Sequence, residues 1–80
     1  MNKEQLLELI EDTDNELKNE LANTTIDKRT RILNLEYLLG KRTGLLRILK
    51  IVDIDKFCDR ANENEFCKQA FIETGKIYSI

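Results

Sequence analysis

The chain has 80 residues, a formal net charge of −2, no proline, no histidine and two cysteines. This length fits one domain, spanning residues 1–80, with a core near the lower limit for independent folding. The missing histidine excludes a Ser-His or Cys-His nucleophilic pair, so we do not expect an enzyme. Two cysteines are too few for a secreted disulfide framework, and no apolar run approaches the roughly 20 residues that cross a bilayer. We therefore expect a cytoplasmic protein without a membrane segment.

Composition and charge order favour an all-α fold. Proline is absent, while leucine, glutamate and lysine, which favour helices, are abundant. Residues 1–25 carry two basic and seven acidic side chains, residues 26–52 carry seven basic and two acidic ones, and the remainder is again acidic. We predict a small helical bundle built on an N-terminal hairpin, with a long central helix and one or two C-terminal helices.

The first predicted helix covers about residues 2–22. Leu6, Ile10, Leu17 and Leu21 recur at the three-and-four spacing of an amphipathic helix. Polar residues interrupt this stripe between Ile10 and Leu17, so either Thr13 or Asp14 must face the core or a partner.

The central helix is predicted over about residues 25–51. Thr24 or Thr25 can cap its start, and Asp27 favours its positive end. A tight turn near residue 24 would place Glu20 near Lys28, Glu16 near Arg31, and Ile10 near Leu38 and Leu39. The N-terminal end of the first helix would then lie opposite residues 42–46.

Gly40 and Gly44 decide whether the central helix is continuous. On one continuous helix the two glycines form a notch that lets another helix pack closely. They share this face of the helix with the large apolar residues Leu33, Tyr37, Ile48 and Ile51. Alternatively, Gly40 ends one helix and Thr43 caps the next. We favour the continuous helix, because the stripe from Ile32 to Leu49 keeps its phase through the glycines. A face of this kind makes a homo-oligomer a further hypothesis.

The C-terminal third is predicted to form helices over about 54–62 and 64–74. The apolar phase slips between them, and Gly75 suits the left-handed position that ends a helix. The tail over 75–80 either packs against the domain or adds to a partner as a strand.

No metal or cofactor site is expected. A structural zinc site needs four soft ligands, whereas Cys58 and Cys67 supply two thiols and no imidazole accompanies them. We interpret both cysteines as small buried groups beside Phe57 and Phe66.

Two charged clusters are candidate binding surfaces. The acidic face of the first helix can recognise a basic surface on a larger protein or ribonucleoprotein; its residues are Glu4, Glu8, Glu11, Asp12 and Asp14. The basic cluster of the central helix is the alternative, a site for nucleic acid or an acidic partner; its residues are Lys41, Arg42, Arg47 and Lys50. Nucleic-acid binding is the less favoured hypothesis, since interleaved aromatic residues are missing and the chain is acidic overall.

Two resemblances bear on function. The hairpin, with Ile32-Leu33-Asn34-Leu35-Glu36-Tyr37-Leu38-Leu39 in its second helix, resembles the two-helix layout of small sporulation phosphatases that act on aspartyl phosphate. That family's Ser-Gln-Glu-Leu-Asp motif is absent, so its activity is not carried over. In composition the chain is similar to small inhibitors encoded by phages and mobile elements, including anti-CRISPR proteins. We expect a non-catalytic, protein-binding regulator or inhibitor.

Overall fold

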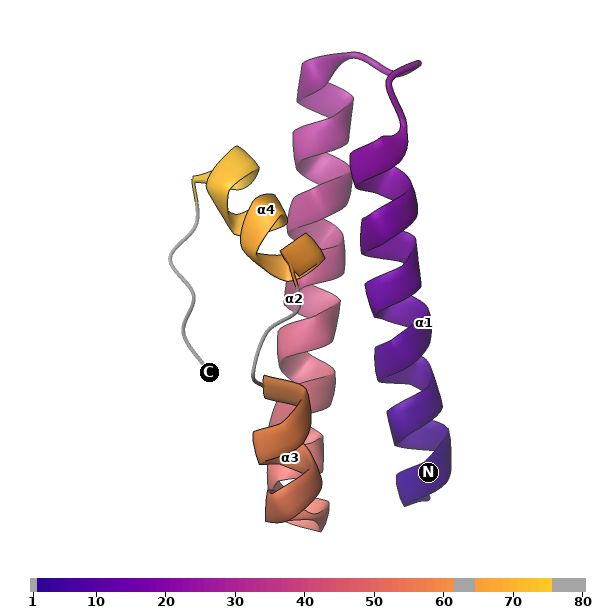
Figure 1. Cartoon of the computed structure of the whole chain (residues 1–80), viewed down its shortest axis with the longest axis vertical. Coiled ribbons are helices and arrows are strands. Elements are labelled where there is room, and N and C mark those ends of the chain that lie inside the picture. The colour runs from indigo at the N-terminus through magenta and orange to yellow at the C-terminus, as the bar shows by residue number, and fades with distance from the viewer. Residues whose placement is uncertain (1, 62–64, 76–80) are drawn as a thin grey trace.

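The computed structural model describes residues 2–61 and 65–75, and they form four α-helices. These are α1 (Lys3–Ala22), α2 (Lys28–Val52), α3 (Ile54–Ala61) and α4 (Glu65–Thr74). The antiparallel α1–α2 hairpin forms the long axis, and α3 and α4 lie one after the other along α2 (Figure 1). The prediction of an all-α bundle built on an N-terminal hairpin is confirmed.

Local side chains explain where the helices begin and end. Asn2 and Gln5 form a reciprocal capping box at the start of α1. Asp27, rather than Thr24 or Thr25, is the N-cap of α2, because its carboxylate accepts the Thr30 N–H at 2.7 Å. Gly75 has a φ of 70° after α4, as predicted for a helix end. The predicted break between α3 and α4 and the tail over 76–80 lie outside the described residues.

The helix α2 is continuous through Gly40 and Gly44, as the unbroken stripe predicts. Its inner face contributes to two apolar clusters. The first joins α1, α2 and α4; its buried members are Leu17, Leu35, Leu38, Leu39, Cys67 and Ala70. The second joins α1 and α2, with Phe57 of α3 packed against it; its buried members are Leu6, Ile10, Leu46 and Leu49.

The predicted hairpin register is wrong by about two helical turns. Ile10 packs with Leu46 and Leu49 instead of Leu38 and Leu39, and Lys3 pairs with Asp53 at 3.3 Å. The start of the first helix therefore lies beside the C-terminal end of α2. The linker residues Asn23 and Asp27 both have extended backbones, and α2 begins well beyond the end of α1 (Figure 1). A tight turn would have kept the two ends level.

The caps of α2 and α3 make stability depend on pH. The Thr30 N–H lowers the pKa of Asp27 below its ordinary value of 3.8, and the Lys56 N–H does the same for the pKa of Asp53, with a smaller contribution from Lys3. A lowered pKa means that stabilisation is complete above the ordinary value and is lost as pH falls through the folded-state pKa. Both caps therefore weaken in acid.

We predict that Asp27→Asn makes the free energy of unfolding less dependent on pH in acid. Asparagine still caps a helix but does not titrate, so the variant should lose less stability than the wild type between about pH 5 and about pH 2. Urea unfolding followed by circular dichroism at several pH values measures this difference. Parallel profiles for the two proteins would contradict the assignment of Asp27 as a titrating cap.

Candidate partner-binding surfaces

Arg42 is a buried structural residue rather than part of a basic surface. It lies on the inner face of α2 with 2% of its surface exposed. Its Nε donates to Asp14 Oδ1 at 2.7 Å, and its Nη2 donates to the Arg60 carbonyl oxygen at 2.8 Å. These bonds link α1, α2 and α3 through one guanidinium. Arg42 is thus inaccessible to a phosphate, and Asp14 is engaged inside the protein.

Arg31 is a second linking residue that the sequence did not reveal. Its guanidinium donates to the carbonyl oxygens of Leu21 and Asn23, at 2.8 and 3.2 Å, and to both carboxylate oxygens of Glu73. Carbonyls at a helix end lack partners within the helix, so Arg31 satisfies the end of α1 and ties it to α4. The predicted neighbour of Arg31, Glu16, instead pairs with Lys41 at 3.6 Å.

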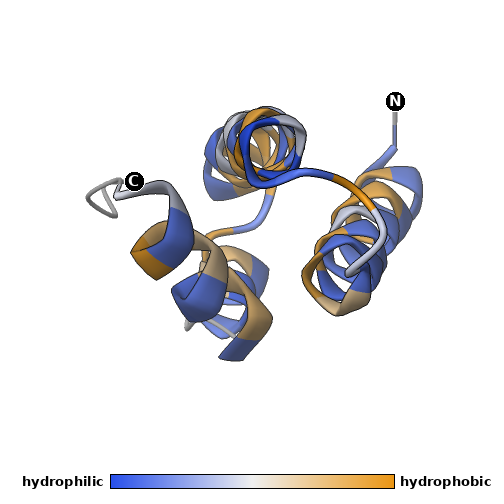
Figure 2. Ribbon diagram, turned by 90° about the horizontal axis from the view of Figure 1, so that it is seen from above, coloured by the Kyte–Doolittle hydropathy of each residue, from blue (hydrophilic) through white to orange (hydrophobic). Residues whose placement is uncertain are grey.

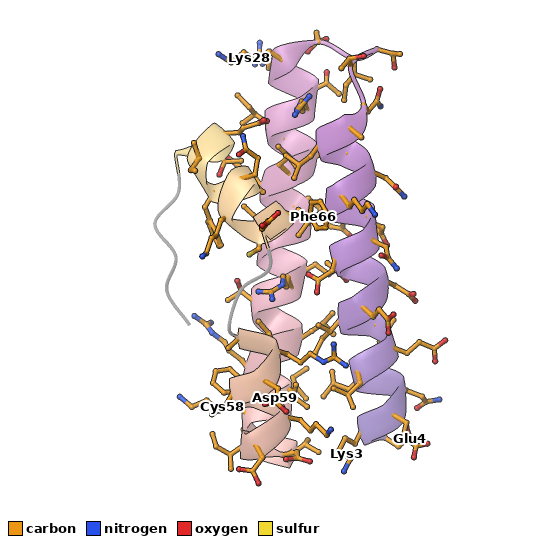
Figure 3. The ribbon with its side chains drawn as sticks, viewed as in Figure 1. Lys3, Glu4, Lys28, Cys58, Asp59 and Phe66 are labelled. Atoms are coloured by element: carbon orange, nitrogen blue, oxygen red, sulfur yellow. The ribbon has the colours of Figure 1, made fainter. Side chains whose placement is uncertain are left out.

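Four of the five predicted acidic residues form one exposed face of α1. Glu4, Glu8, Glu11 and Asp12 recur at three- and four-residue intervals on the side opposite the buried stripe. Within residues 2–61 and 65–75 none of the four forms a hydrogen bond or an ion pair. In Figure 3 the Glu4 side chain points away from the bundle, whereas Lys3 turns towards the start of α3, where its ammonium donates a hydrogen bond to Asp53 Oδ2. We call these four residues the acidic face.

A shallow depression adjoins the acidic face and adds an apolar contact. It is lined by Gln5, Glu8, Leu9 and Asp12. Leu9 is only partly buried there, between carboxylates on either side. A partner with basic side chains around a small apolar group would match this surface in both charge and shape.

The predicted basic cluster does not form a single surface. Lys41 pairs with Glu16, and the Lys50 ammonium lies over the Phe57 ring, 5.5 Å from its centroid. Arg47 is exposed, and the positions of the four residues along α2 direct them to different sides of the helix. The arrangement does not present the row of cations that follows a nucleic-acid backbone.

Gly40 and Gly44 are exposed on the outer side of α2. A Cβ added at either glycine would meet nothing within 4 Å, so no part of the described chain occupies the predicted notch. A glycine inside a helix costs about 1 kcal/mol relative to alanine. The described part of the monomer offers no contact that offsets this cost.

The two cysteines differ in their surroundings. Cys67 is buried in the first apolar cluster, as predicted, but Cys58 is exposed on α3, so the prediction that both are buried is wrong for Cys58. No disulfide joins them. The described residues contain no group of three or more histidine, cysteine, aspartate or glutamate side chains placed to hold a metal ion.

None of the described helices is both long and apolar enough to cross a membrane. Comparisons of this chain with protein-family models, with curated proteins and with solved structures found no match.

Proposed function

We propose that this protein is a small non-catalytic regulator or inhibitor that binds stoichiometrically to a larger protein or ribonucleoprotein. The acidic face of α1 is the surface that would make the contact, and the inhibitors encoded by phages and mobile elements are the class that it resembles in composition. The single observation that carries the proposal is the exposure of four unpaired carboxylates on one helix face.

The carboxylates are arranged in a way that favours a basic partner. Glu4 and Glu8, and again Glu8 and Asp12, are four residues apart, which places like charges next to each other. Such pairs destabilise a helix by about 0.2 to 0.5 kcal/mol each, and a cationic surface laid over them would remove that repulsion. Over the length of this face, about 12 Å, no lysine or arginine lies among them.

The rest of the fold holds this face rigidly. Thr13 and Leu17 are fully buried in the core, and Asp14 is bonded to Arg42, so α1 is fixed along the side opposite the acidic face. A surface held in place before binding loses less conformational entropy on association. Binding is expected to be fast at low salt and to slow as salt screens the charges.

Affinity capture from a host extract tests the proposal. The bait is the wild type or a triple variant, Glu8→Lys with Glu11→Lys and Asp12→Lys. The matched control reverses three exposed carboxylates outside α1, namely Asp55→Lys with Asp59→Lys and Glu65→Lys, so that both variants have the same net charge. Circular dichroism first establishes that both variants keep the helical content of the wild type.

The wild type and the control should retain the same larger protein, identified by mass spectrometry, and the α1 variant should retain at least about tenfold less of it. Equal retention by the α1 variant would contradict the role of the acidic face. Recovery of nucleic acid alone would contradict the function itself.

A further inference from the structure

The outer face of α2 is an apolar stripe that the described part of the chain leaves uncovered. Leu33, Tyr37 and Ile51 are 59%, 67% and 87% exposed, and Ile48 is 47% exposed. Together with Gly40 and Gly44 they recur at three- and four-residue spacing over about 27 Å of helix. Figure 2 shows that α1 and the α3–α4 pair both lie to one side of α2, which leaves the opposite side open.

The glycines make this stripe suitable for another helix. Both lie near its middle, and the space where their side chains would be is empty. A helix surface without side chains lets a second helix axis approach closely, while the larger residues on either side make the remaining contacts. The stripe therefore has large apolar ends and a smooth centre.

The spacing of the stripe makes it complementary to itself. When two copies of α2 are placed antiparallel with their centres at residue 42, Leu33 lies opposite Ile51 of the second copy, and Gly40 lies opposite Gly44 of the second copy. Tyr37 then lies level with Arg47 of the second copy, whose guanidinium can stack on the tyrosine ring. In this register Leu33 meets Ile51 and glycine meets glycine on both sides of a two-fold axis, while Ile48 lies level with Glu36 of the second copy.

Charge favours the antiparallel direction. Glu36 and Arg47 border the stripe on the same side, and neither forms a hydrogen bond or ion pair within the described residues. Antiparallel packing brings Glu36 close to Arg47 of the second copy, and two-fold symmetry repeats the pair. A parallel arrangement would instead set Arg47 level with Arg47. The antiparallel direction also aligns the helix dipoles favourably.

We propose that two copies of this chain associate through the outer faces of α2, packed antiparallel about Gly40 and Gly44. The partner is a second copy of this chain, because the stripe and the charges that border it are complementary to those of the same helix in another molecule. The interface lies away from the acidic face of α1, so this inference does not depend on the proposed function. A dimer would present two acidic faces to partners.

Sedimentation velocity from about 1 µM to about 1 mM tests self-association. The key variant is Gly40→Ala with Gly44→Ala. In the monomer both methyl groups meet open space and improve the helix, so the thermal midpoint measured at low concentration should rise by about 8 to 16 °C. In the dimer the same methyl groups separate the helices, so self-association should weaken by at least about tenfold. A better folded but more weakly associating protein is the expected signature.

Charge exchange tests the direction of packing. Glu36→Arg and Arg47→Glu should each weaken the dimer by about tenfold, and the double exchange should restore wild-type association, because it re-forms both pairs with reversed signs. Glu8→Arg, the same chemical change on the acidic face, is the control and should leave association unchanged. The proposal would be overturned by a wild type that stays monomeric at every concentration, by unchanged association of the alanine variant, or by a double exchange that fails to recover.

Discussion

Asp14→Ala is expected to lower the free energy of unfolding by about 3 kcal/mol. The substitution removes the carboxylate that pairs with the buried Arg42 guanidinium at 2.7 Å, and removing one partner of a buried ion pair is costly. The expected loss is at the lower end of the range for buried pairs, because the Asp14 side chain is itself 21% exposed. Urea unfolding at neutral pH, below the concentration of self-association, measures it.

Asp12→Ala is the matched control for this prediction. It lies two residues away on the same helix, gains the same helix propensity from alanine, and should change the free energy of unfolding by less than about 0.5 kcal/mol. Removing both charges, with Asp14→Ala and Arg42→Met, should recover part of the loss, because the buried cation is then removed together with its carboxylate partner. Equal effects of Asp12→Ala and Asp14→Ala would refute the role of the Asp14–Arg42 pair.

Leu35→Ala is expected to cost about 3 kcal/mol, whereas Leu33→Ala should cost less than about 1 kcal/mol. The two leucines are two residues apart on α2, but Leu35 is completely buried in the first apolar cluster and Leu33 is 59% exposed. Truncation of Leu35 removes buried methyl groups and leaves a cavity, while truncation of Leu33 removes atoms that already contact water.

Thermal and urea unfolding of the two leucine variants tests which side of α2 faces the core. Leu33→Ala should also weaken self-association, because Leu33 belongs to the proposed interface, and its effect on stability must therefore be measured in dilute solution. If Leu33→Ala were the more damaging substitution in dilute solution, α2 would have to be rotated about its axis relative to the arrangement described above.

The helices of this protein could be predicted from the sequence because their signals are local. The three-and-four spacing of leucine and isoleucine predicted α1 and α2, and the stripe that keeps its phase through Gly40 and Gly44 predicted a continuous α2. The left-handed conformation of Gly75 was predicted for the same reason, because it follows from the lack of a side chain at that single residue.

The register between α1 and α2 could not be predicted, because it depends on the path of a five-residue linker and on contacts distant in sequence. Counting residues from an assumed tight turn placed Ile10 beside Leu38, whereas the extended linker places it beside Leu46. The bonds from Arg31 to Glu73 connect residues 42 positions apart. No local pattern indicates such a pair.

The candidate surfaces were predicted in part. Position along α1 sufficed to place four carboxylates together, since an exposed face follows from helical spacing alone. Asp14 and Arg42 were assigned to surfaces because charged residues are seldom buried. The one available signal was the polar gap in the stripe of α1, which required Thr13 or Asp14 to face the core or a partner. In the structure Thr13 is buried and donates to the Leu9 carbonyl, and Asp14 reaches Arg42 as well.

The most direct test of the central claim, that the acidic face of α1 is the binding surface, is the affinity of the purified protein for the partner obtained by capture. Isothermal titration calorimetry should give one copy of this chain bound per site. The α1 triple reversal variant should raise the Kd by at least about tenfold, while the control variant with reversals at 55, 59 and 65 should match the wild type. A Kd that is unchanged by the α1 reversals would contradict the claim.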